Sequence, residues 1–363
     1  ICTHYVPSPS TRRTIAYRHK FGHVVKRVPV TTRILRAPIF ARKKFDIIGF
    51  TLNLRREIIR DKIDIVHYAM YYTSFFILSP LISLLGPVVV QYIGGEMPKN
   101  GFTRSIWRLV LQPALARSAL ILLPDYAKDR SEVEILKNVM RISEDKLKDF
   151  QVLCVDRSVF TEMNERQARD RVNFDHHAIN ILSVTRIPPP HNNPIEKNPF
   201  LMLRIFKELM KTTTRRVVLN IVGFGPGQKA LRDLAEELGI LNAVNMLGYI
   251  DHTKLPEYYS GSDLVFIPYC FTRLNDGLAT FEAFSCARPV CGFKRYASVD
   301  TEQPGGFLID TDVLSGARML AQRLENEKYL FNKGKEARLI SENYSLEYIG
   351  ERLEAIYESC LGF

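Results

Sequence analysis

The residue types between Phe271 and Val290 are suited to binding a ligand that carries phosphate. Gly277 stands where a helix begins, and a helix N-terminus attracts anions because its first amides are unpaired and its dipole is positive there. Glu282 follows about one turn into that helix, where a carboxylate can accept hydrogen bonds from the hydroxyls of a sugar. An anion-binding loop followed by an acid fits a nucleotide-sugar.

Two cations stand near the ends of expected elements in the segment 181–199. A strand ends at Val184 and is followed by Arg186, while Lys197 lies where a helix starts. Ligands of open parallel sheets bind beyond the carboxyl ends of the strands. Arg186 is therefore placed to clamp a diphosphate, and Lys197 adds a point charge. The alternative is that both are solvated surface cations.

A cluster of glycines follows the expected strand 217–222 and precedes a helix. The sequence VGFGPG lacks the GxGxxG spacing of a dinucleotide fingerprint, so NAD is not expected as a ligand. Gly223 and Gly225 either contact another ligand or form only a tight turn from strand to helix, and both alternatives stay open.

Short strand-like runs alternate with amphipathic helices along the whole chain, which is typical of a parallel sheet wrapped by helices. The expected strands of the first half cover residues 1–5, 24–30, 63–67, 88–92, 120–123 and 151–155, with a polar helix over 49–60. Those of the second half cover 181–184, 217–222, 244–247 and 264–267, with helices over 199–210 and 227–238. The charged stretch 162–180 is expected to link two similar α/β halves, and 343–360 is expected to be a long helix.

Basic residues are concentrated in the first half of this 363-residue chain of net charge +11. Residues 1–150 hold 25 Lys and Arg against 12 Asp and Glu, whereas residues 151–363 hold 25 against 27. A basic surface attracts polyanions, and we expect an anionic membrane surface as a partner. A merely soluble surface is the alternative. Nucleic acid is not expected, because the pattern matches no RNA- or DNA-binding module.

Six cysteines are scattered without a CxxC pair, which favours reduced intracellular thiols over disulfides or a zinc site. No signal peptide is visible. We expect the chain to begin inside its first strand, with a few residues preceding it. The apolar run 75–92 is interrupted by Pro80 and by Gly86-Pro87, which indicates a core helix and a buried strand instead of a membrane span. The expected location is cytoplasmic, peripheral at the inner membrane face.

The order of motifs in the second half resembles that of one family. The chain contains V-T-R-I, K-N-P and VGFGPG, then LGYIDHTKLPEYYSGSDLVFIP, then G-x4-EAFSCARPV and GGFLID. This order is similar to the C-terminal domain of retaining glycosyltransferases of family 4, glycosyl transferases group 1, over residues 181–363. The first half resembles the family more loosely, through DIVH at 64–67. The resemblance implies the α/β GT-B fold, in which two Rossmann-like domains with parallel sheets face each other across a cleft.

The resemblance also implies a reaction, the transfer of a sugar from a nucleotide-sugar with retention of anomeric configuration. By position, Arg186 and Lys197 would neutralise charge on the leaving diphosphate, and Glu282 would hold the ribose. Preorganised electrostatic stabilisation of this kind is usually the largest single contribution to catalysis.

The backbone after Gly277 would bind phosphate oxygens, through the amides of Leu278, Ala279 and Thr280. No metal and no other cofactor is implied. The sequence Asp310-Thr311-Asp312 imitates the D-x-D metal motif of another glycosyltransferase fold. It lies in a loop that this family fills with varied residues, and we reject it as a metal site.

One departure from the family pattern concerns the donor sugar. Leu274 stands eight positions before Glu282, where the family has a first glutamate that contacts that sugar. We expect Asn275 or Asp276 to shift and serve in its place.

A second departure lies in the first half, where the family commonly places a histidine after the fourth strand. This chain has Gly94, Gly95 and Glu96 there. Glu96 is either a substitute polar contact or an ordinary exposed loop acid, and His67 is expected to be a packed structural residue. The two departures together imply unusual donor handling or lost activity.

The segment 5–11, YVPSPST, stands where the family usually has a glycine-rich loop facing the donor phosphates. Ser8 and Ser10, with Thr11 and the arginines beyond, are candidates for binding phosphate through hydroxyls and guanidinium groups. The alternative is that Ser10 caps a helix.

We therefore expect an N-terminal acceptor-binding domain over 1–175, with the helix 346–363 packing back on it, and a C-terminal donor-binding domain over 176–345. The predicted activity is metal-independent hexosyl transfer to a lipid-linked or surface-glycan acceptor at the membrane face. The alternative is a non-catalytic GT-B scaffold that binds a glycan or a protein partner.

Overall fold

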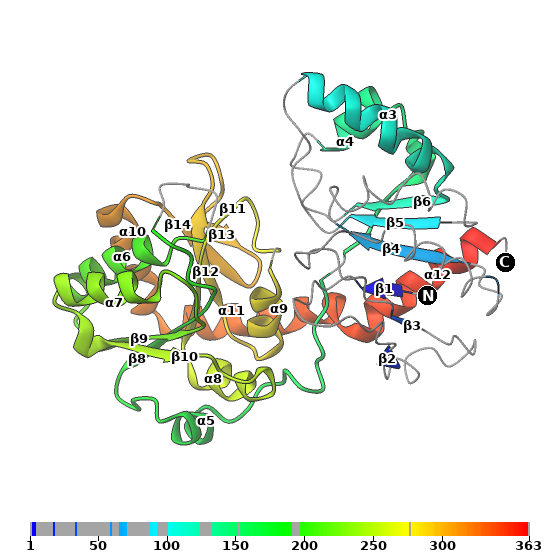
Figure 1. Cartoon of the computed structure of the whole chain (residues 1–363). Helices are drawn as coiled ribbons and strands as arrows, with labels where there is room; N and C mark the ends of the chain where they lie inside the picture. Colours follow the sequence, from blue (N-terminus) through cyan, green and yellow to red (C-terminus); the bar gives the residue numbers. More distant parts are fainter. Residues whose placement is uncertain are drawn as a thin grey trace. The chain divides into compact units, whose positions relative to one another are not determined.

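A computed structural model describes residues 2–4, 17–18, 33–34, 59, 65–70, 88–92, 101–123, 132–151, 153–190, 197–275 and 277–361. Its contacts divide the chain into two compact units (Figure 1). One unit consists of Ile1–Val152 and Ile349–Phe363, and the other consists of Leu153–Tyr348. Both are α/β structures, as the alternation of strands and helices in the sequence predicted.

The first unit contains a parallel sheet of five strands in the order β1-β4-β5-β6-β7. Its strands are β1 (Cys2–His4), β4 (Val66–Met70), β5 (Val88–Tyr92), β6 (Leu120–Leu123) and β7 (Leu147–Asp149). A separate antiparallel pair consists of β2 (Tyr17–Arg18) and β3 (Arg33–Ile34). Besides the closing helix, its described helices are α3 (Gly101–Arg117), α4 (Glu132–Glu134), η3 (Ile135–Val139) and η4 (Glu144–Lys146).

The second unit contains a sheet of seven strands in the order β10-β9-β8-β11-β12-β14-β13, parallel except for β13. The strands are β8 (Ile179–Val184), β9 (Val217–Val222), β10 (Val244–Gly248), β11 (Leu264–Phe271), β12 (Val290–Lys294), β13 (Glu302–Gln303) and β14 (Gly306–Ile309). The helices are α5 (Glu165–Val172), α6 (Pro199–Thr212), α7 (Gln228–Glu237), η5 (Leu241–Ala243), η6 (His252–Lys254), α8 (Leu255–Gly261), α9 (Leu278–Ser285), α10 (Val313–Leu324), α11 (Glu327–Ile340) and η7 (Ser341–Tyr344).

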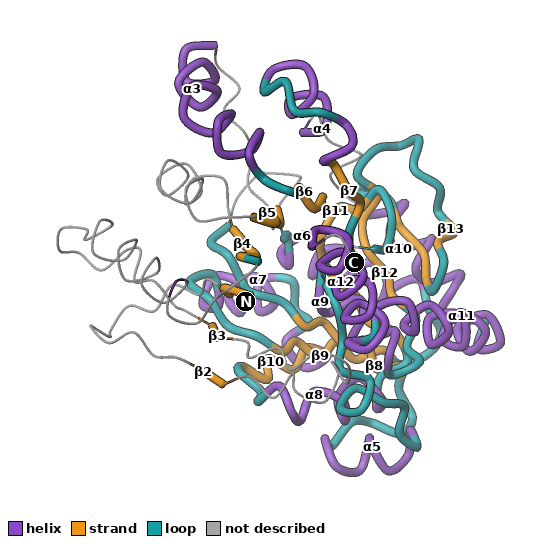
Figure 2. The backbone as a smooth tube through the Cα atoms, turned by 90° about the vertical axis from the view of Figure 1, so that its right-hand side faces the viewer, coloured by secondary structure: helices purple, strands orange, loops and turns teal. Residues whose placement is uncertain are grey.

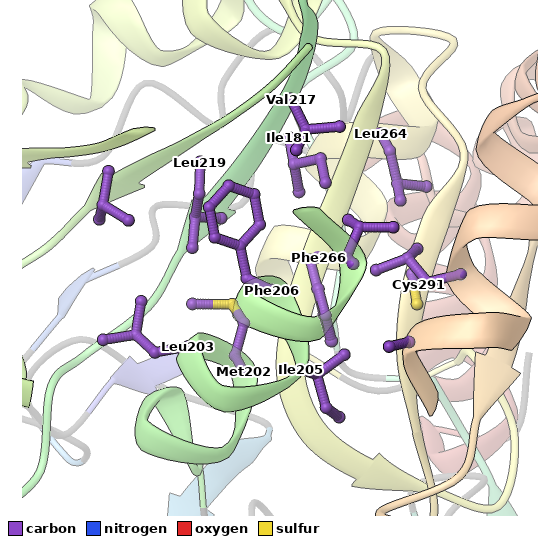
Figure 3. Close-up of a cluster of buried hydrophobic side chains, with 14 of the residues drawn as sticks. Ile181, Met202, Leu203, Ile205, Phe206, Val217, Leu219, Leu264, Phe266 and Cys291 are labelled. Carbon is purple, nitrogen blue, oxygen red and sulfur yellow. The ribbon is translucent and has the colours of Figure 1, made fainter. Parts of the chain in front are cut away.

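Successive residues of the central strands enter two different cores, because side chains alternate between the faces of a sheet. Ile181 and Phe266 pack with residues of α6, α7 and α10 on one face. Figure 3 shows the part of this core that α6 forms with the strands, around Phe206. Leu182 and Val265 pack with residues of α8 and α9 on the other. Burial on both faces explains why these strands are continuously apolar and why they form a rigid base for their loops.

The stretch 162–180 is not a linker, which corrects the expected domain boundary. It contains α5, which lies beside α8 (Figure 2). Arg169 is 6% exposed, and its guanidinium Nη2 lies 2.8 Å from Asp263 Oδ2. The stretch is therefore attached to the second unit by a buried arginine, and the division lies at 152–153 instead of 175–176.

Some other elements expected from the sequence are absent from the structure or lie outside the residues that it describes. The strand expected over 151–155 is wrong: β7 ends earlier, and Val155 forms only an isolated bridge to Ser345. The strand 24–30 and all of the helix 49–60 except residue 59 lie outside the described residues. No helix of the described residues is long and apolar enough to cross a membrane.

The closing helix α12 (Leu346–Leu361) belongs to the first unit from Ile349 onward. On it, the Tyr357 hydroxyl lies 2.5 Å from Nδ1 of His67, and the two rings meet edge to face. His67 lies on β4 and is 1% exposed, so it is the packed structural residue that the sequence predicted.

Candidate functional site

A cavity of about 850 Å³ lies in the second unit, where the chain leaves the carboxyl ends of β8, β9, β10 and β11. Its lining comes from the loops after these strands and from the first turns of α9. Carboxyl ends of parallel strands are the usual place for ligands in an open α/β sheet. A cavity of this size accommodates a ligand of several hundred daltons.

The N-terminus of α9 opens onto this cavity. Gly277 occupies the N-cap position with φ of +84°, a conformation that L side chains rarely adopt. Among the described residues no side chain caps the helix, and its first turn contains no acidic residue. Leu278 and Ala279 line the cavity beside Gly277, so the positive end of the helix dipole faces the space where a ligand would lie.

The glycines after β9 are required by close backbone packing. A methyl group on Gly223 would lie 1.9 Å from Thr185 O, and one on Gly225 would lie 2.1 Å from Ile187 O. Both glycines also line the cavity. The two alternatives that the sequence left open are thus compatible: the glycines form the tight turn, and the turn is part of the cavity wall.

Arg186 lies between the two residues on which these glycines pack. The Thr185 amide donates to Val222 O at 2.9 Å, and the Ile187 amide donates to Phe224 O at 3.2 Å. These bonds extend the pairing of β8 with β9 and fix the backbone of Arg186, whose side chain is exposed and lines the cavity.

Lys197 enters the same cavity from the start of α6. The next residue, Asn198, caps α6 by accepting a hydrogen bond from the Leu201 amide at 2.9 Å. Its own amide donates to Pro268 O at 2.7 Å, which ties the segment to β11. The cap and the strand together fix the backbone from which the side chain of Lys197 extends.

Glu282 is buried at the wall of the cavity, 3% exposed. The Tyr259 hydroxyl donates to Oε2 at 2.8 Å, and Nε2 of His252 lies 2.7 Å from Oε1. Burial, followed by the charge of Glu282, raises the pKa of Tyr259 well above its ordinary value, so this hydroxyl keeps its proton and donates. A buried carboxylate needs such donors, because it loses hydration without them.

Two exposed aromatic side chains stand at the rim of the cavity. Phe224 is 60% exposed and Tyr249 is 70% exposed, and their rings meet edge to face with centroids 6.1 Å apart. They follow the adjacent strands β9 and β10. Large apolar rings left in water at a cavity offer a stacking surface for a flat ligand group.

The structure brings most of the predicted donor-site residues into one cavity. Arg186, Lys197, Gly223, Gly225, Gly277, Leu278, Ala279 and Glu282 line it, whereas Asn275 and Thr280 are not part of the lining. Thr280 is buried, and its amide donates to Gly277 O at 3.1 Å. The remaining predicted residues, Ser8, Ser10, Gly94, Gly95, Glu96 and Asp276, lie outside the described residues.

Sequence reasoning missed four residues of the site: Phe224, Tyr249, His252 and Tyr259. All four lie inside motifs quoted for the resemblance, in VGFGPG and in LGYIDHTKLPEYYSG. For Phe224 and Tyr249 the available sequence signal was an aromatic residue directly after a strand, to which we assigned no role. His252 and Tyr259 lie in η6 and α8, where the sequence gives no such signal.

Leu274 is a core residue, 5% exposed, in the cluster beneath α8 and α9. Its Cδ1 would lie 2.9 Å from a methyl group on Gly306, so it fills the space that this glycine leaves. The leucine that stands in place of the family's first glutamate is therefore part of the hydrophobic core of the second unit.

Residues 165–343 match the family described as glycosyl transferases group 1. The second unit of this chain belongs to the group 1 glycosyltransferases. Relatives include D-inositol 3-phosphate glycosyltransferase 2 of Catenulispora acidiphila, 31% identical over 145 residues (38% of this chain and 32% of the relative). The D-inositol 3-phosphate glycosyltransferase of Gordonia bronchialis is 26% identical over 221 residues (57% and 46%). The chain thus spans about a third to a half of the length of these curated relatives.

Solved structures of the same fold cover most of the chain. Sucrose-phosphate synthase of Thermosynechococcus elongatus aligns with a TM-score of 0.71 and 16% identity over 99% of this chain and 88% of its own. HepE of Anabaena in complex with UDP aligns with a TM-score of 0.66 and 15% identity, over 86% and 82%. The fold is GT-B, as the motif order predicted.

Proposed function

We propose that the protein is a retaining glycosyltransferase that moves a hexose from a nucleotide-sugar to an acceptor without a metal ion. The observation that carries this proposal is the cavity of the second unit. It combines an uncapped helix N-terminus at Gly277 with Arg186, Lys197 and the buried Glu282. Three positive features and one hydroxyl acceptor in one cavity match a sugar diphosphate linked to a ribose.

In this proposal the diphosphate lies against the first amides of α9, with Arg186 and Lys197 beside it. Cleavage of the bond between sugar and phosphate leaves additional negative charge on the diphosphate. Fixed positive groups stabilise that charge more in the transition state than in the ground state, which is what lowers the barrier. Glu282 accepts hydrogen bonds from the ribose. The nucleobase stacks on the face of one of the two rings, Phe224 or Tyr249, whose planes lie 74° apart.

The nucleotide to test first is uridine diphosphate. HepE of Anabaena, whose fold this chain shares, has been solved with UDP and with UDP-glucose. A stacking surface holds any base, so GDP- and ADP-sugars belong in the same experiment.

The acceptor side of the proposal rests on α3 in the first unit. Ile106 and Leu109 are 42% and 79% exposed, and Pro113 is exposed on the same helical face. Arg108 and Arg117 on this helix are exposed too. Apolar and basic side chains together favour contact with an anionic lipid surface. We propose a peripheral position at such a membrane, where a lipid-linked or surface glycan would be the acceptor.

Proton NMR of the purified full chain with UDP-, GDP- and ADP-glucose tests the proposed reaction. We expect release of one nucleoside diphosphate, with the α-anomer of glucose appearing first and with loss of release in Lys197→Ala. Chelation with EDTA should leave the rate unchanged. The β-anomer appearing first would refute retention. Binding without release of nucleotide, with or without acceptor glycans, would favour the non-catalytic scaffold.

A further inference from the structure

The carboxylate of Glu282 is held at both oxygens by side chains from two other elements. Nε2 of His252, in η6, lies 2.7 Å from Oε1, and the hydroxyl of Tyr259, in α8, donates to Oε2 at 2.8 Å. An ionised carboxylate only accepts hydrogen bonds, so Nε2 of His252 carries the hydrogen in this pair. Both distances are those of well-formed hydrogen bonds.

A single buried ring braces both of these partners. The ring of Phe160 is 1% exposed and lies 4.9 Å from the ring of His252 and 6.1 Å from that of Tyr259, between centroids. The two donors are therefore held by packing as well as by their bonds to Glu282, which limits the rotation of the carboxylate about its last side-chain bond.

The two donors differ in their exposure to the cavity. Tyr259 is 0% exposed, whereas the side chain of His252 is 59% exposed and lines the cavity next to Glu282. Tyr259 is thus an internal support. His252 stands at the surface that a ligand would touch.

We propose that His252 is a positioning residue for Glu282 that makes the site selective for a ribose with both hydroxyls. Each carboxylate oxygen has two lone pairs, and His252 and Tyr259 use one on each oxygen. The remaining two lie in the plane of the carboxylate. The two hydroxyls of a cis-diol can donate to both remaining lone pairs only when the plane of the carboxylate is fixed. His252 fixes that plane from the side of the cavity. The inference rests on the proposed function, because it requires a ribonucleotide in the cavity.

The test is calorimetric titration of the full chain with UDP, GDP and ADP, each paired with its 2′-deoxy form. For the nucleotide that binds, the ribo form should bind about tenfold or more tightly than the deoxy form, as expected for a lost hydrogen bond to a charged group. In His252→Ala this ratio should fall toward one. His252→Gln should retain most of it, because its amide nitrogen reaches about as far as Nε2.

Lys254→Ala provides the matched control, because Lys254 is exposed on the same short helix and does not line the cavity. It should keep the wild-type ratio. A ratio unchanged in His252→Ala would overturn the inference. So would an equal loss of affinity for both sugars, which a merely structural role predicts. A wild-type protein that binds none of the nucleotides would overturn the proposed function and the inference with it.

Discussion

Replacement of Gly225 by alanine should lower the free energy of unfolding of the second unit and distort the cavity. The added methyl carbon would lie 2.1 Å from Ile187 O, about 1.3 Å inside the 3.4 Å at which ordinary contact begins. Overpacking costs about 1 to 3 kcal/mol. Because the obstacle here is a backbone carbonyl and not a flexible side chain, we expect about 3 kcal/mol.

Gly239→Ala is the matched control in the same unit. Gly239 has φ of +66°, and a methyl group there would meet nothing within 4 Å. Its cost is therefore the conformational penalty of a left-handed alanine, about 1 kcal/mol. The two variants should differ by about 2 kcal/mol, or about 1 M in the urea midpoint.

Unfolding should be followed by far-UV circular dichroism. The only tryptophan of the chain, Trp107, lies on α3 of the first unit, so its fluorescence reports on that unit. The displaced carbonyl adjoins Arg186, so nucleotide affinity should fall in Gly225→Ala and stay at the wild-type value in Gly239→Ala. Equal midpoints and equal affinities in the two variants would refute the close-packing argument.

Three further outcomes follow from the described residues. Leu274→Glu should lower the melting temperature of the second unit without strengthening nucleotide binding, because it buries a carboxylate in the core; tighter binding would contradict this. Of Phe224→Ala and Tyr249→Ala, the variant that removes the stacking ring should weaken nucleotide binding in titration by about 1 to 3 kcal/mol, and an unaltered affinity in both would exclude a base at this rim. Leu109→Ser should reduce flotation with anionic vesicles relative to wild type, and a wild-type protein that shows no preference for anionic over neutral lipid would contradict membrane contact.

The sequence was sufficient to predict those strands and site residues that are recognised from neighbouring residues in the chain. The expected strands 88–92, 120–123 and 217–222 have the bounds of β5, β6 and β9. These strands are short apolar runs between polar helices, so hydrophobic pattern alone defines them. Glu282 and Gly277 were likewise identified from their spacing in the chain, and both line the cavity.

Features that depend on contacts between distant segments were not predictable in the same way. The stretch 162–180 looked like a linker because it is charged, yet Arg169 pairs with Asp263, which is 94 residues further along. The bonds of His252 and Tyr259 to Glu282 join three separate elements. The sequence around Tyr259 and His252 does not indicate that their partner lies 23 and 30 residues further along the chain.

The most direct test of the donor site is a thermal-shift titration with UDP-, GDP- and ADP-sugars on wild type, Glu282→Ala and Lys197→Ala. A ligand at a hundred times its Kd adds about 2.7 kcal/mol, which corresponds to a rise of about 5 to 10 °C for a unit of this size. We predict such a rise with one nucleotide class in wild type and its loss in both variants. No rise with any nucleotide-sugar, or the same rise in all three proteins, would contradict a donor site in this cavity.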